Sequence, residues 1–309
     1  MERQEEATDS NAKPPQEKSR WSLRRLLRHS SRYWYLLPAV VLVGVFLVLP
    51  FLWTAYWSFT NYGGLGTPQF AGLSNYLTLL QDPILFTSFG NTFLWTVGSL
   101  LLPVGAGLLV AVLTFELIGG ALYRLPFLLP YALSGAVVGV LWSFVLRSDG
   151  AFNVMLRAMG LEELAKSWLL SPPWNTLAMI LAHTWQATGV SVVLFLVGLQ
   201  AIPRDPIEAA RIDGATGWTL FRYITWPLLR PMTVVVIGIS LVNSLKTFDV
   251  IWVMTQGGPY RSSETLAVTM YRETFLLFKY GYGATIAVVL SAIVILLSWL
   301  YLRRTLRSV

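Results

Sequence analysis

Polar side chains recur at helical spacing within one otherwise apolar stretch of this 309-residue chain. They stand at positions i, i+3, i+4 and i+7, which would place them on one face of a helix. They are Ser240, Asn243, Ser244 and Thr247. Such groups are costly against lipid, so we expect them to face the interior of a helix bundle or a water-filled cavity. Uncharged donors and acceptors of this kind suit a hydroxylated ligand such as a sugar; the alternative is hydrogen bonding between helices that only tightens their packing.

A second apolar stretch contributes further polar candidates. Gln186 offers an amide that can read hydroxyl groups, whereas we expect its neighbour Trp185 to serve in packing. His183 is expected to be hydrogen-bonded within the bundle. Lys246 and Asp249 stand at i and i+3 and are predicted to form a structural ion pair or part of an outer gate. A proton relay would instead need acids near the middle of the membrane.

The residues that enzymes and metal sites require are missing from the sequence. The chain has no cysteine and two histidines, His29 and His183, which lie far apart in sequence, so we predict no metal site. A phosphate-binding loop ends in Gly-Lys followed by Ser or Thr, and no Gly-Lys pair occurs. No nucleophile, base and orienting group stand together. We therefore expect no catalytic residues and no ATP hydrolysis in this chain.

The apolar residues occur in runs long enough to cross a bilayer. The chain is 55% hydrophobic and 13% charged, about half the charge of a typical soluble domain. A crossing helix needs about 20 apolar residues, and six stretches qualify. They are approximately Leu36–Trp57, Asn91–Phe115, Leu125–Leu146, Thr176–Leu199, Thr233–Met254 and Thr285–Leu302. The prediction is an all-α, multi-pass membrane protein.

The basic residues predict its orientation. Of the 23 Lys and Arg residues, 16 fall on the side where six spans place both termini, and 6 fall on the other side. This asymmetry makes the termini cytoplasmic. The net charge of +7 follows the membrane topology, so it indicates contact with lipid rather than nucleic acid. Residues 1–34 are predicted to form a basic, disordered tail, and residues 306–309 a second tail. The first span lacks a signal-peptide cleavage site, so we expect it to remain as a membrane anchor.

The segment Pro203–Pro231, between the fourth and fifth spans, predicts a short helix. Asp205 is placed to cap its N-terminus, Pro206 suits the first helical position, and Glu208 completes a capping box. Gly214 is expected to end the helix in a left-handed conformation.

The same segment predicts two further features. Ala209 and Ala210 would give the short helix a slim side that can seat in a groove of another protein. A second helical stretch is expected from Trp218 to Tyr223, before Pro227.

The motifs of this loop resemble the EAA loop of binding-protein-dependent ABC importer permeases. The residues that carry the likeness are Glu208-Ala209-Ala210, Asp213-Gly214-Ala215, Phe221, Ile224 and Pro227. Further matches, typical of the carbohydrate-uptake branch, are Asn75-Tyr76, Asn91-Thr92, Leu129-Pro130, Trp142, the run from Gly198 to Pro203, and Gly257-Gly258-Pro259. The order most resembles the first permease of maltose, lactose or glycerol-phosphate importers, over about residues 35–305. The large extracytoplasmic insert and extra N-terminal spans of the maltose-type subunit are absent.

This resemblance implies a type I importer core of six helices at 35–305, with a cytoplasmic coupling loop at 201–231. In such permeases the loop helix docks on an ATP-binding subunit. The positions that would do so here are Glu208, Ala209, Ala210, Asp213, Gly214 and Ala215; the plainer interpretation is that Glu208 and Gly214 only cap a surface helix. The implied substrate path holds Gln186, Ser240, Asn243, Ser244 and Thr247.

The resemblance also implies partners. These are a second homologous permease, two ATPase subunits that bind ATP and Mg²⁺, and an extracytoplasmic binding protein that delivers a sugar. The implied location of the protein is a bacterial or archaeal cell membrane. A di- or oligosaccharide is expected, with disaccharide, longer glycan and glycerol-phosphate all open. The alternatives are an ion-coupled secondary transporter, suggested by Lys246 and Asp249, and a membrane scaffold whose loop only recruits a partner.

Overall fold

The computed structural model describes residues 35–305, so the predicted tails at 1–34 and 306–309 lie outside the described residues. Within 35–305 the chain is helical, and the only β-type pairing there is an isolated bridge between Thr60 and Phe70. The predicted all-α class is therefore confirmed. Five helical segments are long and apolar enough to cross a membrane, and a bent pair of helices brings the number to six.

The first apolar segment is helical from Leu37 to Trp57. It consists of α2 (Leu37–Val43), the π-helical η1 (Gly44–Val48) and α3 (Leu49–Trp57). The described residues up to Trp53 belong to one compact unit, and residues from Thr54 onward form another. The bounds agree with the predicted first span.

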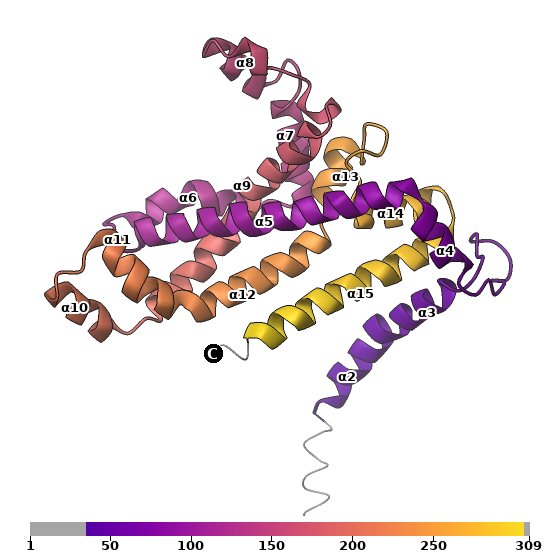
Figure 1. Cartoon of the computed structure of the whole chain (residues 1–309), viewed down its shortest axis with the longest axis horizontal. Coiled ribbons are helices and arrows are strands. Elements are labelled where there is room, and N and C mark those ends of the chain that lie inside the picture. The colour runs from indigo at the N-terminus through magenta and orange to yellow at the C-terminus, as the bar shows by residue number, and fades with distance from the viewer. Residues whose placement is uncertain (1–34, 306–309) are drawn as a thin grey trace, which may run out of the picture. The chain divides into compact units, whose positions relative to one another are not determined.

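The second unit is built around α5 (Pro83–Phe115) and α9 (Trp174–Gln200), which pack along each other (Figure 1). The Asp82 side chain caps α5 by accepting a hydrogen bond from the backbone N–H of Ile84 at 2.9 Å. The helix therefore starts before the predicted Asn91. The last long helix is α15 (Tyr280–Thr305), which contains the predicted sixth span.

The predicted third span is broken into two helices. These are α6 (Gly120–Tyr131) and α7 (Gly135–Val145), whose axes differ by 98°. Ser134 has extended backbone and caps α7, because its side chain accepts a hydrogen bond from the backbone N–H of Val137 at 3.3 Å. The predicted third span, Leu125–Leu146, is therefore a bent pair of helices rather than one straight helix.

The fifth span is also displaced from its predicted position. Helical backbone runs from Gly217 to Leu245, through α11 (Gly217–Leu220), the π-helical η4 (Phe221–Thr225) and α12 (Trp226–Leu245). The predicted stretch Trp218–Tyr223 is therefore the start of this span. The helix ends at Leu245 and a new one, α13 (Asp249–Thr255), follows, so the predicted continuity to Met254 is wrong.

Short helices lie at the two ends of the second unit. Near the start of α5 are α4 (Ser74–Gln81), α13, α14 (Leu266–Tyr271) and the π-helical η5 (Arg272–Leu276), while α10 (Arg204–Ile212) lies at the opposite end (Figure 1). The segment between α7 and α9 holds α8 (Ala151–Ala158) and two 3₁₀ turns, Glu162–Leu164 and Trp168–Leu170.

Buried apolar side chains form two main clusters along α5 and α9. One surrounds Trp95, Met179 and Ile251, where α13 and α14 join the bundle. The other surrounds Phe195 and Leu229, where α12 joins it. Burial of these side chains holds α5 in place along its length. The candidate sites described below lie on elements that pack against α5.

Candidate functional site

The N-terminus of α10 differs from its predicted form. Pro203 occupies the cap position, and no side chain caps the helix. The predicted cap, Asp205, and the predicted first residue, Pro206, lie inside the first turn instead. The negative charge of Asp205 there still favours the positive end of the helix dipole. Because proline has a fixed φ and no N–H to satisfy, Pro203 is a suitable residue at the point where the helix begins.

The C-terminus of α10 has the predicted form. Gly214 has a φ of +85°, the left-handed conformation that glycine adopts without a steric cost. Around it, the backbone N–H of Asp213 donates to the Ala209 carbonyl at 3.0 Å, and that of Ala215 donates to the Ala210 carbonyl at 2.8 Å. These bonds satisfy carbonyls that the end of a helix otherwise leaves open.

The predicted coupling residues divide into an outward and an inward set. Glu208, Ala209 and Asp213 are exposed, as is Ile212, whose exposure of 87% is unusual for an apolar side chain. Ala210 is buried, so the slim side predicted for both alanines is formed by Ala209 alone. The exposed residues define an accessible helix face at one end of the second unit.

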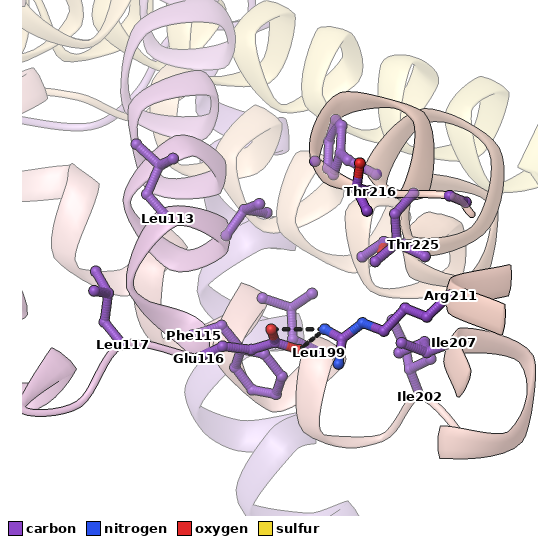
Figure 2. A pocket seen from close by; sticks show the side chains of 15 residues that line it. Leu113, Phe115, Glu116, Leu117, Leu199, Ile202, Ile207, Arg211, Thr216 and Thr225 are labelled. Atoms are coloured by element: carbon purple, nitrogen blue, oxygen red, sulfur yellow. Dashed lines mark hydrogen bonds and ion pairs between the residues drawn. The ribbon is translucent and has the colours of Figure 1, made fainter. Parts of the chain in front are cut away.

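A largely apolar cavity of about 710 Å³ separates α10 from the ends of α5 and α9 (Figure 2). Its walls include Leu113, Phe115, Leu199, Ile202, Ile207 and Phe221. Because the cavity lies between these elements, α10 contacts α5 directly only around the edge of the cavity.

One ion pair crosses from α10 to the end of α5 (Figure 2). A terminal nitrogen, Nη2, of Arg211 donates to both carboxylate oxygens of Glu116, at 2.6 and 2.7 Å. The side chains are 47% and 66% exposed, respectively. No sequence pattern predicted this pair, since the partners lie 95 residues apart and share no local motif.

The second candidate site is a polar pocket of about 250 Å³ near the broken third span. Its polar lining residues are His183, Gln186, Asn243, Lys246, Thr247 and Asp249. Three of the five predicted path residues therefore meet there, namely Gln186, Asn243 and Thr247. Ser240 is not among the lining residues, and the buried Ser244 donates its hydroxyl to the Leu241 carbonyl at 2.8 Å.

Helix α12 ends before it reaches Thr247 and Asp249, which were predicted to lie on the same helix. Thr247 lies beyond the helix, which ends at Leu245, so it reaches the pocket from irregular backbone. The predicted ion pair between Lys246 and Asp249 is wrong, because the chain leaves the helix between them and no such pair forms among residues 35–305. Both charged side chains instead line the pocket.

Gln186 links this pocket to the break in the third span. Its side-chain nitrogen donates to the backbone carbonyl of Leu133 at 2.7 Å. Trp185 makes an edge-on contact with Trp142, which confirms its packing role. His183 makes an edge-on contact with Trp95 and also lines the pocket, but the expected hydrogen bond of its side chain is not formed among residues 35–305.

A cluster of ion pairs lies in the connection that leads from α13 to α15. The carboxylate of Glu264, which is fully buried, binds Arg261 at 2.9 Å and Arg272 at 2.6 Å. Glu273 is paired with Arg261 at 3.1 Å and Lys279 at 3.2 Å. Burial alone would lower the pKa of Arg261, but the hydrogen bonds and charges of the two glutamates outweigh it and raise this pKa above its ordinary value.

The segment Gly257-Gly258-Pro259 forms a tight turn beside this cluster. The Gly257 carbonyl accepts from the backbone N–H of Ser263 at 3.0 Å, and Gly257 has a φ of +83°. The sequence contains one local signal for the cluster, the i, i+3 spacing of Arg261 and Glu264, whereas Glu273 lies 12 residues from Arg261 and has no such signal.

A bundle of long apolar helices, with an exposed helix at one end and a polar pocket between spans, defines a multi-pass membrane protein. Residues 104–305 match the model of the binding-protein-dependent transport system inner membrane component family, and the chain belongs to this family. The resemblance of the EAA loop is thereby confirmed.

Individual relatives agree with this assignment. A probable ABC transporter permease of Pyrococcus horikoshii is 39% identical over 280 residues, covering 86% of this chain and 93% of the relative. The lactose transport system permease protein LacF of Rhizobium radiobacter is 31% identical over 289 residues, covering 91% and 96%. A chain in the crystal structure of a bacterial alginate ABC transporter, in complex with a pentasaccharide-bound periplasmic protein, has the same fold, with a TM-score of 0.79 at 23% identity, covering 90% of this chain and 94% of that one.

Proposed function

We propose that this chain is a permease subunit of an ATP-driven sugar importer. The observation that carries the proposal is the exposed face of α10, with Glu208 and Ala209 outward, at the opposite end of α5 from α14 and the loop that leads to it. A subunit that must receive force from a cytoplasmic ATPase needs such a projecting element. The family supports the transport role, and relatives named for lactose and for starch degradation products support a di- or oligosaccharide substrate.

The proposed assembly contains two permeases and two ATPase subunits, with ATP and Mg²⁺ bound by the latter. The positive charge of the segments around α10 supports a cytoplasmic position for it and for both termini. The turn at Gly257 then faces outward, where an extracytoplasmic binding protein would deliver substrate. The name of the family and the periplasmic protein bound in the similar alginate transporter structure support that partner.

The polar pocket is the proposed passage for substrate. Two amides and one hydroxyl, from Gln186, Asn243 and Thr247, offer directional hydrogen bonds without a net charge. The pocket also contains one cation, Lys246, and one anion, Asp249, whose charges balance. A neutral hydroxylated molecule satisfies such a lining at a lower desolvation cost than an ion would.

Reconstitution tests the proposal directly. The chain is placed in lipid vesicles with its second permease, ATPase subunits and binding protein, and uptake of radiolabelled maltose and maltotriose is measured. We expect uptake that requires ATP. Uptake driven by an ion gradient without the ATPase would support a secondary transporter, and stable assembly without uptake of any sugar that the binding protein holds would support a scaffold.

Asn243 and its neighbour Ser244 provide a matched test of the pocket. Asn243→Ala removes an amide that lines the pocket, and we expect uptake to fall about tenfold, equivalent to the loss of one hydrogen bond of about 1.4 kcal/mol. Ser244→Ala removes a hydroxyl that bonds within its own helix, so uptake should change less than twofold. Equal effects of the two substitutions would show that the pocket is not the passage.

A further inference from the structure

The helix α10 is attached to the bundle in a way that permits it to move. Two short connections join it, residues 201–203 before it and 213–216 after it. The second connection contains Gly214 and leads to Gly217, both with positive φ. The 710 Å³ cavity on the inner side of α10 limits the packing that would otherwise hold it against α5. Movement of α10 therefore acts directly on α5 only through a specific contact.

The pair between Arg211 and Glu116 supplies that contact. Among the described residues, it is the only side-chain hydrogen bonding that α10 makes with another element. Glu116 is the C-cap residue of α5, so a displacement of its carboxylate acts directly on the end of that helix. One guanidinium nitrogen binds both carboxylate oxygens, and such charge-assisted bonds hold α10 at a short distance from the end of α5.

The far end of α5 is bound to the loop that follows α13. The side-chain nitrogen of Asn91 donates to the carbonyls of Ser262 at 2.7 Å and Glu264 at 3.0 Å. The hydroxyls of Ser88 and Thr269 are 2.6 Å apart. A single helix of 33 residues, about 50 Å long, thus connects α10 to the loop at the opposite end of the bundle.

We propose that Arg211 and Glu116 are positioning residues for the coupling step, whose ion pair makes α5 follow α10 and so conveys its movement to the loop held by Asn91. This inference rests on the proposed function, in which ATP drives α10. Because both side chains are about half exposed, the pair adds little to stability, and its loss should leave the fold intact.

Spin labels can test the pair, because the chain has no native cysteine. One label is placed at Asp205→Cys on α10, outside the residues proposed to contact the ATPase. The second is placed either at Ile118→Cys, just after α5, or at Leu302→Cys on α15; all three positions are exposed. Distances are measured in the full complex, first without nucleotide and then trapped with ATP, Mg²⁺ and vanadate.

We expect nucleotide to change the 205–302 distance and to leave the 205–118 distance unchanged. Reversing either charge alone, by Arg211→Glu or Glu116→Arg, should make the 205–118 distance change as well. The double reversal should restore the unchanged distance, which a merely steric role of either residue would not achieve. Arg204→Glu, a matched reversal at an exposed residue of α10 that forms no ion pair among residues 35–305, should behave as the unsubstituted chain does.

Two results would overturn the inference. If the single reversals leave the 205–118 distance unchanged, or the double reversal fails to restore it, the pair does not link the helices, while the proposed function stands. If nucleotide leaves the 205–302 distance unchanged in the unsubstituted complex, α10 is not driven by ATP, and the proposed function fails together with this inference.

Discussion

At the scale of single residues, the buried carboxylate of Glu264 organises the turn that follows α13. It lies at 0% exposure and balances the charges of Arg261 and Arg272. It also accepts a hydrogen bond from the Thr269 hydroxyl at 2.8 Å. A buried group with this many partners cannot be replaced without leaving a charge uncompensated.

We therefore predict that Glu264→Gln destabilises the chain by about 3 kcal/mol, because the glutamine keeps the shape and loses the charge. Thermal unfolding in detergent measures this loss. Glu163→Gln, at an exposed glutamate outside any ion pair of residues 35–305, should change the stability by less than about 0.5 kcal/mol. Similar losses in both variants would contradict the prediction.

The raised pKa of Arg261 gives the sign of the pH dependence. A cation whose pKa is higher in the folded state stabilises the fold at all pH values below its unfolded pKa, and this stabilisation is lost as the pH rises through the folded pKa. For arginine both values are strongly alkaline. The contribution of Arg261 should therefore be constant between about pH 6 and pH 9.

At the scale of elements, the contact between α5 and α9 depends on the absence of a side chain at Gly107. A Cβ there would lie 2.3 Å from the Cβ of Ser191 and 3.0 Å from its backbone carbon. Gly105, one half-turn away, has open space around a Cβ. Substitution at Gly107 therefore tests helix packing, whereas substitution at Gly105 tests intrinsic helix propensity alone.

We predict that Gly107→Ala destabilises the chain by about 1–3 kcal/mol, because the helices must separate. Gly105→Ala should leave stability unchanged or raise it by up to about 1 kcal/mol, since alanine favours helix. Thermal unfolding of both variants in the same detergent distinguishes the effects. A loss at Gly105 as large as at Gly107 would show that propensity or lipid contact, rather than packing, controls this region.

The elements also show how far sequence reasoning reaches. Apolar runs predicted the long helices, because the cost of unsatisfied backbone in lipid leaves few alternatives. The breaks at Ser134 and Lys246 were missed, because hydropathy does not register a local cap or a polar pocket. The Gly214 conformation followed from local backbone physics, whereas the Arg211–Glu116 pair depends on tertiary structure and has no local signal.

At the scale of the whole molecule, the two candidate sites lie on different parts of the bundle, and the proposed function requires them to communicate. The polar pocket involves α9 and the end of α12, whereas the exposed face of α10 follows the other end of α9. Disturbing the backbone near α10 should therefore separate ATP hydrolysis from uptake without altering the pocket. Gly214 has a φ of +85° and open space around a Cβ, so a side chain there would cause backbone strain without a steric clash.

We predict that Gly214→Val leaves membrane insertion and ATP hydrolysis in place but lowers uptake at least tenfold, because a β-branched residue opposes the left-handed conformation and misplaces α10. Gly66→Val is the matched control: Gly66 has a φ of +77°, nothing near its Cβ, and a place outside both sites. Uptake, hydrolysis and surface labelling are measured in parallel. Normal uptake by the Gly214 variant would remove the coupling role of this turn.

The bond from Gln186 to Leu133 sets which hydrogen-bonding group Gln186 offers in the proposed passage. A backbone carbonyl is an acceptor only, so the amide nitrogen of Gln186 is directed towards Leu133, and its oxygen is the group left to bind a substrate. In the proposed passage, a substrate hydroxyl would donate its hydrogen to that oxygen. An analogue whose corresponding hydroxyl is capped as a methyl ether should be bound by the delivery protein and yet be rejected at the membrane.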